Sequence, residues 1–250
     1  MSPIYPPLYE HWLRPRLHVV RAEKLATCDD CAMVNPVGVT RDPGPFRADL
    51  KCCTYFPYVP NFGLGAMLQT NASGARVRFA AAKAQGLFLP TGLHAAAERE
   101  VLQSEAGYDA FGKDERLLCP FHDRQRNRCG VWLNRPGVCA TYFCKTEAGF
   151  PYWQDVEAYL NHFEWGLANW TTERMGVDEE RIEMCKAALS IEESGEERDY
   201  FLRAAWGADF GQEESFFRRA LEIARAISDE ELAALIGDRG TELELRIRNV

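Results

Sequence analysis

This 250-residue chain has no apolar run that approaches the length of a membrane span, and it has no excess of positive charge. A transmembrane helix needs about 20 mostly apolar residues. Prolines and arginines interrupt every candidate run in residues 1–27, so we also expect no signal peptide. The formal net charge of -8 argues against general affinity for nucleic acid or anionic lipid. We therefore expect a cytoplasmic protein, and in that compartment clustered cysteines bind metal more often than they form disulfides.

The chain also lacks the short signatures of several cofactor sites and catalytic sites. Asn61-Phe-Gly-Leu-Gly65 has neither the preceding strand nor the third glycine of a dinucleotide-binding loop. No four cysteines have the local spacing of bacterial ferredoxins. No spacing of histidines and cysteines indicates a catalytic triad, so the catalytic residues of any enzyme activity are unknown. A metal site in this chain has to be assembled by the fold from distant segments.

What the sequence does have is nine cysteines, eight of them in two compact sets. The first set is Cys28, Cys31, Cys52 and Cys53, and the second is Cys119, Cys129, Cys139 and Cys144. Cys28 and Cys31 can chelate one metal because only two residues separate them. The adjacent side chains of Cys52 and Cys53 diverge, so we expect them to bind different metals or different irons of one cluster. The ninth cysteine, Cys185, lies on the apolar side of a predicted helix, and we expect it to be a small buried hydrophobic residue.

We predict that all eight clustered cysteines are metal ligands. Soft thiolates suit both iron–sulfur clusters and zinc. We favour an iron–sulfur cluster, of the 4Fe-4S type, with zinc as the alternative and disulfides or free thiols as the least expected outcome. His122 is a further candidate ligand because it follows Cys119 by three residues, but eight thiols leave little need for it.

The order of these cysteines carries a family resemblance. Cys28-x2-Cys31, the Cys52-Cys53 pair and Cys119…Cys129…Arg135-Pro136-x2-Cys139 together resemble the zinc- or iron-chelating cysteine-cluster family, known by its CxxCxxCC signature. The resemblance covers about residues 28–145 and implies a small cytoplasmic protein that binds an iron–sulfur cluster or zinc, without implying a reaction. The chain departs from the family pattern in two places. Twenty residues separate Cys31 from Cys52 where the family has few, and Ala140 follows Cys139 where arginine is common.

Positive charge gathers around the second cysteine set. The seven residues of this basic collar are Lys113, Arg116, Arg124, Arg126, Arg128, Arg135 and Lys145, against three acidic residues in the same stretch. The collar would lower thiol pKa values and offset the charge of a thiolate-bound cluster, and it offers a docking face for a partner protein. It is equally compatible with a solvated basic loop. Arg135 is the candidate cofactor-binding residue, because a guanidinium donates to cluster sulfides or to a substrate carboxylate. In the alternative interpretation, it pairs with an acid such as Asp123.

The fold class that we predict is mainly α. A loop-rich cysteine-cluster metal-binding region with a small β-hairpin, residues 1–150, packs against an acidic helical region, residues 151–250, or the two form one continuous domain. From residue 171 onward there are twenty acidic and eleven basic residues. Helices are predicted at 9–25, 61–69, 73–85, 92–106, 138–144, 178–190, 196–206, 212–227 and 229–236, with hairpin strands at 117–121 and 129–133 and a strand at 241–250. After Pro151, apolar residues at three- and four-residue steps predict an amphipathic helix of about five turns, whose stripe of Trp153, Val156, Leu160, Phe163, Leu167 and Trp170 should be core.

Three functions are compatible with these features. The first is an iron–sulfur protein with a redox or electron-transfer role, or an accessory role to a partner enzyme. The second is a structural zinc module that acts in protein interaction. The third is an iron–sulfur enzyme with an open iron that binds substrate.

Overall fold

The computed structural model describes residues 7–17, 31, 33–34, 46–70, 79–80, 82–83, 87–142, 146–191 and 195–249. Within these ranges the fold is mainly helical, as predicted. The helices are α1 (Pro7–Leu13), α2 (Asn61–Gln69), α4 (Ala97–Ala106), α5 (Gly137–Thr141), α6 (Phe150–Arg174), α7 (Glu179–Ser190), α8 (Glu196–Trp206), α9 (Glu213–Arg225) and α10 (Asp229–Arg248). Short 3-10 turns cover Tyr108–Ala110, Glu115–Leu117, Trp132–Asn134 and Gly207–Asp209.

Two small antiparallel sheets accompany the helices. Strands β1 (Val59–Pro60), β3 (Gly92–Leu93) and β2 (Phe88–Leu89) form one sheet in that order, with Leu93 paired to both Val59 and Phe88. Strands β4 (His122–Asp123) and β5 (Arg128–Cys129) form the second. A hairpin is therefore present, but β4 lies after the predicted strand at 117–121, and β5 shares only Cys129 with the predicted strand at 129–133. The three-stranded sheet was not predicted, because two-residue strands leave no alternating pattern in the sequence.

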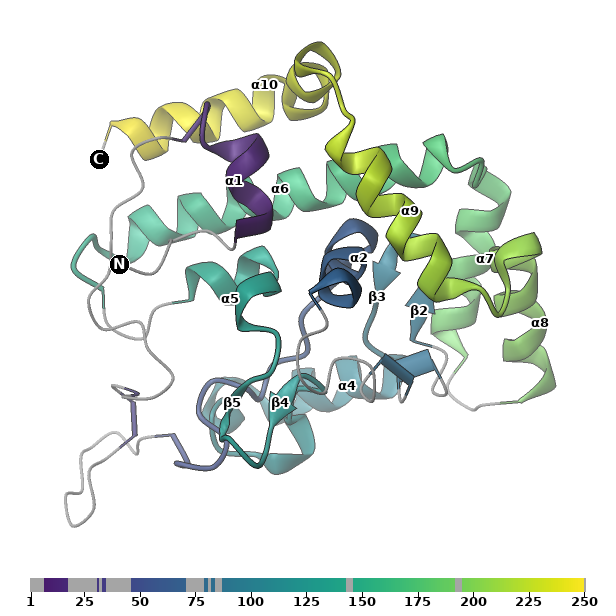
Figure 1. The fold of residues 1–250 in the computed structure, drawn as a ribbon. Coiled ribbons are helices and arrows are strands. Elements are labelled where there is room, and N and C mark those ends of the chain that lie inside the picture. Colours follow the sequence, from purple (N-terminus) through teal and green to yellow (C-terminus); the bar gives the residue numbers. More distant parts are fainter. Residues whose placement is uncertain are drawn as a thin grey trace.

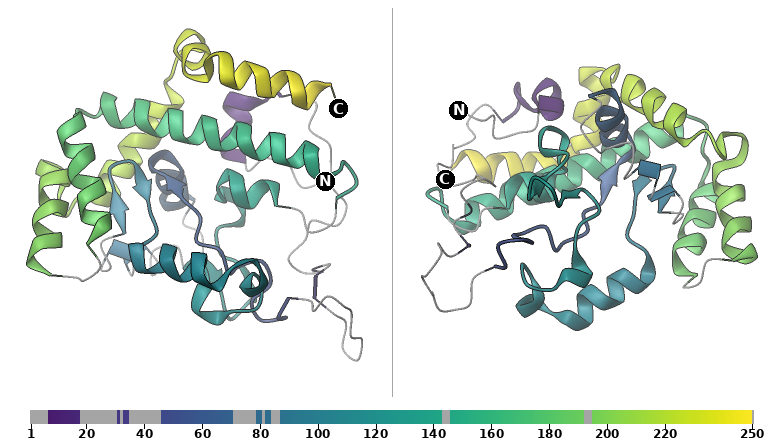
Figure 2. Two further views of the ribbon diagram at one scale, coloured as in Figure 1. Left: turned by 180° about the vertical axis from the view of Figure 1, so that it is seen from behind. Right: turned by 60° about the horizontal axis from the view of Figure 1, so that its bottom comes forward.

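Helix α6 lies in the middle of the fold (Figure 1). It lies between α10 on one side and the part that contains α4, β4 and β5 on the other, and the views in Figure 2 agree. The predicted stripe is core: Val156, Leu160, Phe163 and Leu167 are fully buried. Each such side chain contributes about 1.5–3 kcal/mol of burial free energy. Phe62 and Ala66 of α2 lie in the same apolar cluster, so a single core contains residues from both sides of the expected boundary at residue 150.

Helix α2 packs closely on α9, and a glycine permits this. A Cβ at Gly65 would lie 2.2 Å from the backbone carbonyl oxygen of Phe217 and 2.8 Å from the Cβ of Leu221. Only a residue without a side chain lets the two backbones approach this closely. The packing brings α2, the sheet and α9 into a second apolar cluster that also holds Trp206 and Phe217.

The predicted strand at 241–250 is wrong. Residues 241–248 belong to α10, which runs on across a kink at Gly237, where φ is 54°. The alternation of Glu242, Leu243, Glu244 and Leu245 resembled a strand, but Leu243 is buried whereas Leu245 is 54% exposed. Leu243 and Ile247, four residues apart, face the core together, which is helical spacing.

The remaining predicted helices agree with the structure to different degrees. α2, α7, α8 and α9 lie within two residues of the predicted bounds, whereas the predicted helix at 9–25 is described only as the short α1. The helix expected at 92–106 begins at Ala97, because residues 92–93 form β3. Most of the predicted helix at 73–85 lies outside the described residues. Among the described residues, no helix combines the length and the apolar character that crossing a bilayer requires.

Candidate metal centre

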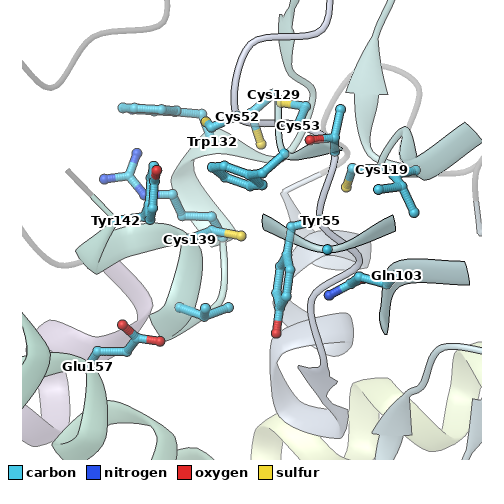
Figure 3. A pocket seen from close by; sticks show the side chains of 16 residues that line it. Cys52, Cys53, Tyr55, Gln103, Cys119, Cys129, Trp132, Cys139, Tyr142 and Glu157 are labelled. Atoms are coloured by element: carbon cyan, nitrogen blue, oxygen red, sulfur yellow. The ribbon is translucent and has the colours of Figure 1, made fainter. Parts of the chain in front are cut away.

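Five of the eight predicted ligands line a single cavity of about 470 Å³. They are Cys52, Cys53, Cys119, Cys129 and Cys139, and they come from both cysteine sets. Figure 3 shows their side chains around one space, together with aromatic side chains and the carboxylate of Glu157. None of these five cysteines forms a disulfide, and all are partly buried. The fold therefore brings together segments that lie more than 80 residues apart in the sequence.

The Cys52-Cys53 pair is held by the turn of the β4–β5 hairpin. Lys51, which has a left-handed backbone with φ of 54°, donates from Nζ to the carbonyl oxygen of Asn127 at 2.8 Å. Asn127 donates from Nδ2 to the carbonyl oxygen of Ala48 at 2.7 Å. These reciprocal bonds join an irregular segment to a hairpin and fix the two thiols beside Cys129 of β5.

Cys119 is positioned by backbone hydrogen bonds and by a guanidinium. Its N–H donates to the carbonyl oxygen of Cys53 at 2.7 Å, and its Sγ accepts from the N–H of Phe121 at 3.4 Å. Arg99 of α4 donates to the carbonyl oxygens of Leu117 and Leu118, the latter at 3.0 Å. The guanidinium thus caps the carbonyls that end the short turn before Cys119.

Cys139 enters the cavity on α5, which is anchored to α6 through a buried carboxylate. Glu164 accepts a hydrogen bond from the N–H of Gly137 at 2.7 Å and another from the hydroxyl of Tyr9. A Cβ at Gly137 would lie 2.7 Å from the Cβ of Leu160, so glycine is required for this contact. Burial raises the pKa of Glu164 to about 7, although both hydrogen bonds oppose that shift.

The thiols influence one another electrostatically, as groups that share one site do. The pKa of Cys52 is lowered to about 7, first by a hydrogen bond with Cys53 and to a smaller extent by the charges of Arg135 and Lys51, while burial opposes the shift. The same bond raises the pKa of Cys53, as do burial and the nearby Cys119 and Cys129. Burial and then the neighbouring thiols raise the pKa of Cys139.

Arg135, the predicted cofactor-binding residue, lines the cavity. Its side chain is buried, and its guanidinium carbon lies 3.7 Å from the centre of the Trp132 ring. Its charge lowers the pKa of both Cys52 and Cys139. In the alternative interpretation Asp123 was its partner; Asp123 accepts from the backbone N–H groups of the turn that follows it.

The other predicted ligands differ from these five cysteines. Cys31 is half-buried and is not one of the lining residues, while Cys28 and Cys144 lie outside the described residues. His122 is buried in β4, opposite Cys129 in the hairpin register. Within the described ranges, no three His, Cys, Asp or Glu side chains are arranged to hold a single metal ion. Cys185 is buried among Leu89, Ala188 and Leu202, which confirms it as a core residue.

The basic collar is partly neutralised by acidic neighbours. Arg116 forms an ion pair with Asp114 at 2.5 Å, and Arg124 with Glu115 at 2.8 Å. Such exposed pairs contribute little to stability, because water screens them. Lys145 lies outside the described residues. Arg135 differs from Arg116 and Arg124, because it is buried and its charge lowers the pKa of Cys52.

Sequence reasoning missed several residues that complete the cavity. They include Tyr55, Gln103, Phe111, Tyr142 and Glu157. Glu157 falls on the polar face of the predicted helix after Pro151, and no local pattern separates it from a solvated residue. Only the packing of α4, α5 and α6 around the thiols gives these side chains a shared location. Comparisons of this chain with known family models, with curated proteins and with solved structures find no match.

Proposed function

We propose that this protein binds an iron–sulfur cluster in the cysteine-lined cavity, with a redox or electron-transfer role or an accessory role to a partner enzyme. Its ligands would be drawn from Cys52, Cys53, Cys119, Cys129 and Cys139. The observation that carries the proposal is that five thiols from distant segments surround one cavity. Without a soft cation, such a gathering of thiolates is costly, because like charges repel in a partly buried site.

The arrangement of the thiols favours a cluster as the occupant. In Figure 3 the labelled cysteines lie on different sides of the space and do not all point at one atom. Cysteines that hold a cluster bind different irons, so they surround it, whereas the ligands of zinc converge within about 2.3 Å of one ion. A cavity of about 470 Å³ also has room for a group of several atoms.

The charges around the cavity suit bound thiolates. Arg135 is buried beside the thiols, and Lys51 precedes the Cys52-Cys53 pair. Positive charge and hydrogen-bond donors near cluster sulfurs stabilise the bound state and tune its potential. When bound, a cluster supplies one-electron redox chemistry, and the residues of this chain hold it, shield it from water and compensate its charge. The exposed basic collar is the proposed docking face for a partner protein.

Structural zinc is the second candidate. The segments that carry the thiols contain two-residue strands and short turns, and a metal that joins them would add folding free energy. An enzyme with an open iron is the third candidate, favoured by the cavity's extension beyond the thiols.

Anaerobic purification with iron, sulfide and zinc analysis tests the proposal, together with an electron paramagnetic resonance spectrum of the reduced protein. We expect brown protein with iron and sulfide. Cys53→Ser, Cys119→Ser, Cys129→Ser and Cys139→Ser should each lose most of the metal, whereas Cys185→Ser, the matched control in the core, should retain it. Colourless protein with stoichiometric zinc would favour the second candidate. Equal metal content in all five variants would contradict the ligand assignment.

A further inference from the structure

The cavity continues beyond the cysteines. Figure 3 shows Glu157 at the end opposite to Cys52 and Cys129, with Tyr55 between them and Gln103 on the far wall. These residues come from α6, from the segment before β1 and from α4. The volume of about 470 Å³ lies within the range of small-molecule sites, which is about 300–1,000 Å³. The cavity therefore extends past Cys52, Cys53 and Cys129 to Glu157.

Flat apolar side chains also line this cavity. The rings of Phe111 and Tyr142 pack edge to face, with centroids 5.2 Å apart, and both line the cavity. Tyr55 and Tyr142 are each 36% exposed, which is high for large aromatic side chains beside a cavity. Leu117 and Val138 complete the apolar lining. Aromatic faces of this kind bind flat apolar groups and attract cations.

Among the described residues that line the cavity, Glu157 supplies a carboxylate. Glu157 lies one turn before Asn161, whose side chain hydrogen-bonds to it, and loss of hydration raises the pKa of Glu157. A carboxylate in an apolar cavity is stabilised by a cation that replaces the lost water. Gln103 adds one amide that can donate and accept. The lining near Glu157 thus offers aromatic surface, a negative charge and a neutral polar group, whereas the positive charge of Arg135 in the same cavity stacks on the Trp132 ring.

We propose that the part of the cavity next to Glu157 binds a small organic amine. Its flat apolar body would contact Tyr55, Phe111 and Tyr142, and its ammonium group would bind the Glu157 carboxylate. This inference rests on the proposed function, because it assigns the space among the thiols of the same cavity to the metal centre. The amine would occupy the part of the cavity that a bound cluster does not fill.

Benzylamine is the probe for this site, with benzyl alcohol and benzoate as neutral and anionic controls of the same shape. Binding to the full chain is measured by saturation-transfer NMR with titration. Benzylamine should bind more tightly than either control. Glu157→Gln should lower the affinity for benzylamine about tenfold or more, because it removes one charge-assisted hydrogen bond. The affinity for benzyl alcohol should stay nearly unchanged. Tyr55→Ala should lower the affinity for both benzylamine and benzyl alcohol, since it removes aromatic surface.

Glu173→Gln is the matched control, because Glu173 is an exposed glutamate of the same helix outside the cavity. It should bind benzylamine as the wild type does. Equal benzylamine affinity in the wild type and in Glu157→Gln, tighter binding of benzoate, or no binding at all would overturn the amine site.

Metal analysis of each sample keeps this test separate from the proposed function. Metal-loaded protein that fails to bind benzylamine overturns the amine site alone. Metal-free protein that binds benzylamine through Glu157 supports the amine site and contradicts the cluster.

Discussion

The cysteine-bearing part and the helical part of this molecule are stabilised in different ways. The helical part, α6 to α10, buries continuous apolar stripes and large side chains such as Phe163, Trp206 and Phe217. The cysteine-bearing part, residues 46–58 and 111–142, has two-residue strands and short turns, joined by side-chain donors such as Lys51, Asn127 and Arg99. Net hydrogen-bond contributions are about 1 kcal/mol each, so a metal bound by the thiols, as proposed, would add much to the stability of this part.

Metal removal is the strongest way to separate the two parts. If the thiols hold a metal centre, a chelator should expose residues 46–58 and 111–142 to hydrogen exchange and proteolysis, because metal binding free energy is folding free energy there. α6, α9 and α10 should keep their protection, since their core is apolar. Hydrogen exchange followed by mass spectrometry measures both parts together. Uniform loss of protection would show that the two parts are one cooperative unit.

Gly65→Ala should destabilise the packing of α2 on the helical part. The added Cβ would meet the Phe217 carbonyl at 2.2 Å, so α2 and α9 must separate. We expect a loss of about 3 kcal/mol in the free energy of unfolding, as for overpacked cores, measured by urea denaturation. Gly63→Ala is the matched control on the same helix: its Cβ would meet only the side chains of Pro60 and Val59, at 3.3 Å and 3.4 Å. A similar loss in both variants would argue against the close-approach explanation.

Glu164 links the two parts, and its charge should make stability depend on pH. Its pKa rises from 4.5 in the unfolded chain to about 7 in the folded protein. Between these values the folded state binds the extra proton, so stability falls as pH rises, by about 3 kcal/mol in total. In Glu164→Gln this component should vanish. The difference in unfolding free energy between wild type and variant, measured from pH 4 to pH 8, should therefore change with pH in that direction. A constant difference would contradict the assignment.

Ser228→Ala should have the smallest effect and should be confined to α10. Ser228 and Glu231 form a complete capping box at the start of this helix. Removing the serine oxygen should cost about 1 kcal/mol, seen as a small fall in the thermal midpoint. Metal content should not change, because α10 does not line the cavity. A loss of metal in this variant would mean that the two parts are more tightly coupled than their cores indicate.

Long amphipathic patterns predicted their elements well, and short patterns did not. The stripe from Trp153 to Leu167 predicted both a helix and its buried face, because many apolar residues recur there at the spacing of one helical face. The alternation after Thr241 was too short to separate strand from helix, and contact with the core decided it. Strands β1, β2 and β3 gave no signal at all, since each pairs only two residues.

The sequence by itself determined that this chain is mainly helical, that Cys185 is a core residue, and that eight other cysteines form two sets. These properties follow from local composition and spacing, which a linear pattern records. Only the tertiary structure decided that Cys52, Cys53, Cys119, Cys129 and Cys139 share one cavity, and that Glu157 and Tyr55 lie with them. The physical reason is that such a site depends on packing between α4, α5, α6 and a hairpin. Contacts between distant segments are set by the fit of whole surfaces, and no local spacing encodes that fit.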